Sequence, residues 1–110
     1  MENFGAFDAP LCLYGHTHVP AVYAEALDGA LRLPLQVGVA AVQDEARWLA
    51  NPGSVGQPRD GDPRASYALY DPAARTFTVH RVAYDIGAVQ DKILAAGLPP
   101  RLAARLDFGW

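Results

Sequence analysis

The chain has 110 residues, of which 51% are hydrophobic, and a formal charge of −3 at pH 7. This composition is typical of one globular domain rather than of a disordered or fibrous chain. No basic run is present, which argues against nucleic acid as a partner. No apolar run reaches the roughly 18 residues that span a bilayer, so we expect no membrane association. A single cysteine, and an N-terminus without signal-peptide character, favour a cytoplasmic location.

Short apolar runs separated by turn residues predict a strand-rich region over residues 11–82. The Asp-Gly dipeptide at residues 28–29 favours a two-residue hairpin turn, and a further turn is expected at residues 43–45. Residues 76–82 alternate apolar and polar side chains, which is typical of a half-buried strand, and should pair with residues 66–70. The predicted strands are residues 11–14, 22–27, 30–35, 36–42, 46–50, 66–70 and 76–82.

Residues 85–106 are expected to form a helical tail. Asp85 can cap a helix whose apolar residues recur at helical spacing, and Gly97 can end it. Two prolines after this glycine can open a second short helix that runs through Leu106.

Two histidines, His16 and His18, follow the first predicted strand, which we expect to be buried. In an extended segment the two imidazoles would point to one side, with Cα atoms about 6.5 to 7 Å apart. That separation suits two neighbouring metal ions, which in phosphoryl-transfer sites lie roughly 3.5 to 4 Å apart. By spacing alone, two loop histidines without metal are the favoured interpretation.

Residues 51–54, Asn-Pro-Gly-Ser, together with Arg59 form a second candidate site. Turn amides and a guanidinium can hold a phosphate group, so we take Asn51, Ser54 and Arg59 as candidate substrate-binding residues. The stronger interpretation is a structural turn with glycine at positive φ, in which Arg59 and Arg64 pair with Asp60 and Asp62 or face solvent.

The sequence Gly-His-Thr-His-Val-Pro at the end of a strand, followed by a hairpin and then by Asn-Pro-Gly-Ser, resembles the C-terminal part of calcineurin-like metallophosphoesterases. It is most similar to the small bacterial phosphodiesterase and diadenosine-tetraphosphatase-like branch, and the resemblance runs from Leu11 to Leu106. It implies an α+β fold that is the C-terminal half of a four-layer αββα sandwich. Residues 1–110 would then be a single partial domain of mostly β-strands, followed by one or two C-terminal helices.

The resemblance also implies a role for the two histidines. His16 and His18 would each bind one of two divalent ions, with manganese, zinc, iron and nickel all open. Such a binuclear site hydrolyses phosphomonoesters or phosphodiesters by acidifying a water and stabilising the phosphoryl charge.

The remaining motifs of these enzymes, DxH, GDxxD and GNH, do not occur in this sequence. We therefore expect a missing N-terminal half or a companion chain to supply the other ligands, and this chain alone to be inactive. A half sandwich would also expose an apolar sheet face, so we expect a homo-oligomer. The alternative function is a non-catalytic binding or oligomerisation module that retains part of the fold.

Overall fold

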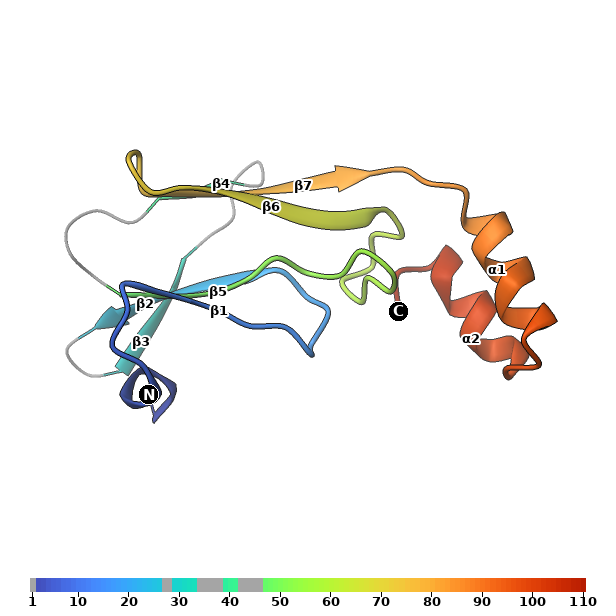
Figure 1. Ribbon diagram of the computed structural model, residues 1–110, viewed down its shortest axis with the longest axis horizontal. Helices are drawn as coiled ribbons and strands as arrows, with labels where there is room; N and C mark the ends of the chain where they lie inside the picture. The colour runs from blue at the N-terminus through green and yellow to red at the C-terminus, as the bar shows by residue number, and fades with distance from the viewer. Residues whose placement is uncertain (1, 27–28, 34–38, 42–46) are drawn as a thin grey trace.

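The computed structural model of the chain describes residues 2–26, 29–33, 39–41 and 47–110 (Figure 1). Its elements form two β-sheets and a C-terminal helical tail. In chain order they are η1 (Glu2–Ala6), β1 (Leu11–Leu13), β2 (Ala21–Ala26), β3 (Gly29–Leu33), β4 (Val39–Ala41), β5 (Trp48–Asn51), β6 (Ala65–Asp71), β7 (Thr76–Val82), α1 (Ile86–Ala95), α2 (Pro100–Ala104) and η2 (Arg105–Asp107).

The first sheet has the strand order β1-β5-β2-β3. β1 is parallel to β5, whereas β2 is antiparallel to both β5 and β3, so the predicted hairpin is confirmed. The expectation that Gly29 is a turn residue of this hairpin is wrong, because Gly29 lies in β3 and pairs with Ala26. The other predicted turn residue, Asp28, lies outside the described residues.

The second sheet has the strand order β4-β7-β6. The predicted pairing of β6 with β7 is confirmed, with Tyr67 opposite His80 and Tyr70 opposite Phe77. Of the strand predicted at residues 36–42, the structure describes only β4, and the turn predicted at residues 43–45 lies outside the described residues.

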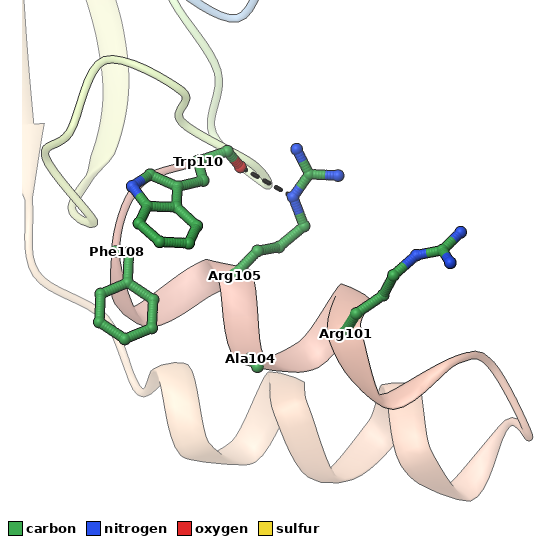
Figure 2. Close-up of a pocket in the computed structure, with 5 residues that line it drawn as sticks. All are labelled: Arg101, Ala104, Arg105, Phe108 and Trp110. Atoms are coloured by element: carbon green, nitrogen blue, oxygen red, sulfur yellow. Dashed lines mark hydrogen bonds between the residues drawn. The ribbon is translucent and has the colours of Figure 1, made fainter.

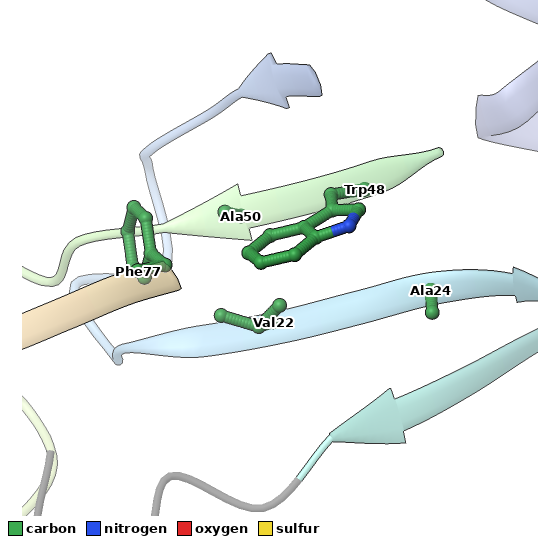
Figure 3. Close-up of a cluster of buried hydrophobic side chains, with 5 residues drawn as sticks. All are labelled: Val22, Ala24, Trp48, Ala50 and Phe77. Carbon is green, nitrogen blue, oxygen red and sulfur yellow. The ribbon is translucent and has the colours of Figure 1, made fainter. Parts of the chain in front are cut away.

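A small hydrophobic cluster joins the two sheets (Figure 3). Trp48 is its largest member and is only 2% exposed. Phe77 reaches the cluster from β7, and Tyr70 of β6 contacts the Trp48 ring edge-on with 6.2 Å between ring centroids. The buried members are Val22, Ala24, Trp48, Ala50 and Phe77.

The helical tail has the cap and the stop that the sequence predicted. The Asp85 carboxylate accepts a hydrogen bond from the Ala88 amide at 3.0 Å, and Gly97 with φ of 75° follows the end of α1. The second helix, predicted through Leu106, is observed as α2 continued by η2. Strands followed by C-terminal helices confirm the predicted α+β class. None of the described helices has the length and apolar character that a bilayer span requires.

The molecule is open in shape, with the two sheets at one end and the helical tail at the other (Figure 1). Its radius of gyration is 16.2 Å, whereas a compact domain of this length would have about 13 Å. The prediction that the first strand is buried is wrong, because Leu13 is 60% exposed. β1 lies at the edge of its sheet, where β5 is its one described neighbour.

Candidate functional site

The two histidines lie in the loop that leaves the carboxyl end of β1. His16 has φ of 78° and His18 has φ of 62°, a left-handed backbone conformation that residues other than glycine rarely adopt. The Thr17 amide donates to the Gly15 carbonyl at 3.0 Å, which closes a γ-turn around His16. A γ-turn with positive φ is the rarer and more strained form. The predicted extended geometry of this segment is therefore wrong, because the chain bends at each histidine.

Such a conformation persists only where surrounding contacts hold it, since it costs on the order of 1–3 kcal/mol per residue. Asn51, the last residue of β5, provides these contacts and is fully buried. Its Nδ2 donates to Thr17 Oγ1 at 2.9 Å and, at a longer 3.5 Å, to the Gly15 carbonyl. Its Oδ1 accepts from the Gly53 amide at 2.9 Å. Both ends of the amide group are thus bound within the protein.

The parallel pairing of β1 with β5 explains why Asn51 lies beside the histidine loop. Leu13 and Ala50 are register partners, and the Tyr14 amide donates to the Ala50 carbonyl at 3.0 Å. The carboxyl ends of the two strands are therefore side by side. Burial raises the pKa of the Tyr14 hydroxyl above its ordinary value.

The orientation of the His18 ring is set by a backbone group. Its Nδ1 lies 2.7 Å from the carbonyl oxygen of Gln57. Because a carbonyl only accepts hydrogen bonds, Nδ1 carries the proton and donates it. The neutral ring then has a free lone pair on Nε2, the form in which histidine binds a metal. The Arg59 amide also donates to the His18 carbonyl, at 3.2 Å.

The other two candidate substrate-binding residues surround Gln57. Ser54 Oγ accepts from the Gln57 amide at 2.9 Å, and the exposed Arg59 guanidinium donates to Gln57 Oε1 at 3.1 Å. Sequence reasoning missed Gln57, because it acts through its main-chain carbonyl, which every residue type has. Its position is set instead by the turn that starts at Asn51, where Gly53 has the expected positive φ of 86°.

The donor chemistry of the loop fits part of a metal site. Two imidazoles are suitable ligands for zinc and several other divalent ions. Among the described residues, however, no group of three or more histidine, cysteine or carboxylate side chains is placed to hold a metal ion. Because zinc sites use three or four protein ligands, His16 and His18 can supply only a share of the ligands.

A charged cluster continues from the same loop. Arg64 pairs with Asp62 at 2.8 Å, as one of the structural interpretations predicted, and this hydrogen-bonded partner lowers the pKa of Asp62 to about 2. Arg81, which the sequence did not point to, forms an ion pair with Asp60. The Gly61 amide donates to the carbonyl of residue 109 at 2.9 Å. One loop thus contacts both the histidine segment and the C-terminal tail.

The described part of the chain also has a pocket of about 300 Å³ on the helical tail (Figure 2). Phe108 and Trp110 stack on each other with 4.8 Å between ring centroids, and they are 53% and 62% exposed. The pocket is lined by Arg101, Ala104, Arg105, Phe108 and Trp110. None of these residues belongs to the histidine loop, so the pocket is a separate feature.

Comparisons with known proteins agree with this description. Residues 4–75 match the calcineurin-like phosphoesterase superfamily domain. The crystal structure of a metallophosphoesterase from Sphaerobacter thermophilus is 49% identical, with a TM-score of 0.85 over 99% of this chain and 46% of that chain. An uncharacterised protein of Methanocaldococcus jannaschii is 40% identical over 99 residues, which are 90% of this chain and 39% of that protein. The chain therefore spans less than half the length of each of these relatives.

Proposed function

Because the chain belongs to the calcineurin-like phosphoesterase superfamily, we propose that it is the histidine-bearing part of a metal-dependent phosphoesterase. The proposed reaction is the hydrolysis of a phosphomonoester or phosphodiester. The observation that carries this proposal is the hydrogen bond between His18 Nδ1 and the Gln57 carbonyl. This bond leaves the Nε2 atom of the ring available to bind a metal.

In this proposal His16 and His18 each bind one of two divalent ions, of manganese, zinc, iron or nickel. When bound, such ions acidify a water and stabilise the negative charge of the phosphoryl group. His18 holds a ligand atom in place and does not transfer a proton, because its Nδ1 proton is engaged by a carbonyl. Ser54 contributes by holding the Gln57 amide, and the carbonyl of the same residue orients the His18 ring. The exposed Arg59 guanidinium is proposed to contact the substrate phosphate.

The proposed site needs ligands from a further portion of polypeptide, either an N-terminal half of the same domain or a companion chain. Three observations support this: the two-histidine donor set, the open shape of the molecule and the match to only 46% of the Sphaerobacter chain. We propose that residues 1–110 form one partial domain, with a strand-rich region at residues 11–82 and a helical tail at residues 85–106. A cytoplasmic location is part of the same proposal.

A complementation assay tests this function. The chain is mixed with a polypeptide corresponding to the part of the Sphaerobacter metallophosphoesterase that it does not match. Hydrolysis of p-nitrophenyl phosphate and bis(p-nitrophenyl) phosphate is then measured in Mn²⁺. We expect activity from the mixture, none from either part alone, and loss of activity in His18→Ala. The control is His80→Ala, which replaces a histidine stacked on Tyr67 in the second sheet and should keep activity.

A complex that forms and binds metal but hydrolyses neither substrate would contradict the phosphoesterase proposal. The second candidate function, a non-catalytic binding or oligomerisation module, would then lead. The exposed aromatic pair Phe108 and Trp110, together with its pocket, favours that alternative, since such surfaces commonly contact another molecule. In a module of this kind, replacing both histidines with alanine would leave partner binding unchanged.

A further inference from the structure

We propose that Asn51 and Thr17 are positioning residues for the metal ligands, and that their hydrogen bond holds His16 and His18 in the left-handed conformation. The claim that these residues position metal ligands rests on the proposed function. The conformational part rests only on contacts within this chain. It also assigns to Asn51 a role different from the substrate contact expected from sequence.

Thr17 is placed to control both histidines because it lies between them. Its Oγ1 accepts from Asn51 Nδ2 at 2.9 Å and from the Val19 amide at 3.4 Å. The first bond attaches the loop to the end of β5, and the second closes the bend at His18. A change at this one hydroxyl therefore acts on both left-handed residues, whose φ angles are 78° and 62°.

The Asn51 amide reaches the other side of the same turn. The Gly15 carbonyl, which accepts from the Thr17 amide to close the γ-turn, is also 3.5 Å from Asn51 Nδ2. One NH₂ group thus contacts acceptors on both sides of His16. An amide side chain can do this while its oxygen accepts from the Gly53 amide, whereas a carboxylate would put an oxygen that cannot donate against the Gly15 carbonyl.

The position of Asn51 is itself fixed. Asn51 pairs with Ala21 in the antiparallel β2–β5 ladder, and its side chain is fully buried. Its amide orientation is determined by partners on both ends, so it cannot turn away without leaving a buried polar group unpaired. The strained loop is therefore attached to a rigid point of the sheet rather than held by its own sequence.

The matched variants are Thr17→Val and Thr17→Ser in the full 110-residue chain. Valine has the shape of threonine without the hydroxyl, whereas serine keeps it. Thr17 is exposed, so neither variant should prevent folding. Two quantities are measured: the {¹H}-¹⁵N heteronuclear NOE of the His16 to His18 amides in the chain alone without metal, and the Zn²⁺ affinity, by NMR titration, of the complex that each variant forms with the Sphaerobacter portion used in the complementation assay.

We expect Thr17→Val to lower the heteronuclear NOE values of the loop and to weaken Zn²⁺ binding about five- to tenfold, because the bond from Asn51 and the longer bond from the Val19 amide are both lost. Thr17→Ser should retain both values. Combining Thr17→Val with Asn51→Ala should cost less than the sum of the two single effects, because both substitutions remove the same bond between Thr17 and Asn51.

Unchanged NOE values and affinity in Thr17→Val would overturn the inference, as would equal losses in the serine and valine variants. If Zn²⁺ leaves the histidine signals of the unsubstituted complemented complex unchanged while Thr17→Val still lowers the NOE of the chain alone, the conformational role stands and the proposed metal role fails. The two failures are therefore distinguishable.

Discussion

His18 Nδ1 donates to the carbonyl oxygen of Gln57 at 2.7 Å, across 39 residues of sequence. This bond determines which ring nitrogen is available as a ligand, and it connects the histidine loop to the turn that starts at Asn51. The Gln57 amide in turn donates to Ser54 Oγ at 2.9 Å. The Ser54 hydroxyl thus helps to fix the position of the Gln57 carbonyl that binds the His18 ring.

Replacing Ser54 with alanine should therefore weaken Zn²⁺ binding severalfold, because the Gln57 carbonyl loses its support. Gln57→Ala is the matched control and should bind as the unsubstituted chain does, since it keeps both backbone groups. The ¹⁵N chemical shifts of His18 should report the Nδ1-protonated tautomer in the unsubstituted chain. The Nε2-protonated tautomer there would contradict this account of the ring.

The Asp62–Arg64 pair should give a measurable dependence on pH. The hydrogen bond from Arg64 lowers the pKa of Asp62 from 3.8 to about 2 in the folded chain. Because the folded pKa is the lower one, the stabilising contribution is complete above about pH 4 and is lost as pH falls through about 2. A ¹³C titration of the Asp62 carboxyl should show this low midpoint, and Arg64→Gln should raise it.

Arg59→Gln is the control for this titration, since Arg59 donates to Gln57 and not to Asp62. It should leave the Asp62 midpoint where it is. An ordinary midpoint for Asp62 in the unsubstituted chain would show that the ion pair does not persist in solution.

Phe77 should be decisive for stability, because it is the buried residue through which β7 reaches the cluster on the first sheet. Phe77→Ala is expected to lower the free energy of unfolding by about 3–5 kcal/mol, which urea denaturation measures. Phe108→Ala removes the same side chain from a position that is 53% exposed and should cost far less. Equal losses in the two variants would contradict the assignment of the core.

The chain purified alone should self-associate. Its large exposed apolar side chains include Leu13 and Leu69, each 60% exposed, and Trp110, which is 62% exposed. Light scattering coupled to size exclusion should give a mass above 11.8 kDa at micromolar concentration. A single species at the monomer mass with a cooperative melt would rule out this expectation.

The parts of the fold that were predictable from sequence are those decided locally. The cap at Asp85, the stop at Gly97 and the pairing of residues 66–70 with residues 76–82 depend on neighbours in the chain, and all three are confirmed. The exposure of β1 was not predictable, because it depends on which strand lies at the sheet edge.

The histidine pair shows the same limit within the candidate site. Its residue types and its place after a strand were evident, but its bent conformation was not. That conformation depends on Asn51, 34 residues from Thr17, and on the Gln57 carbonyl, 39 residues from His18. The spacing of the two histidines favoured an extended segment, because contacts between residues this far apart in the chain produce no pattern in the sequence.

Native mass spectrometry of the complemented complex tests the central claim most directly, because it counts polypeptides and metal ions together. The account predicts a complex of this chain with the added portion that carries two divalent ions. The metal ions should be lost when His16 and His18 are both replaced by alanine, while the complex remains. A complex without metal, or one whose metal content is unchanged by that double substitution, would contradict the claim.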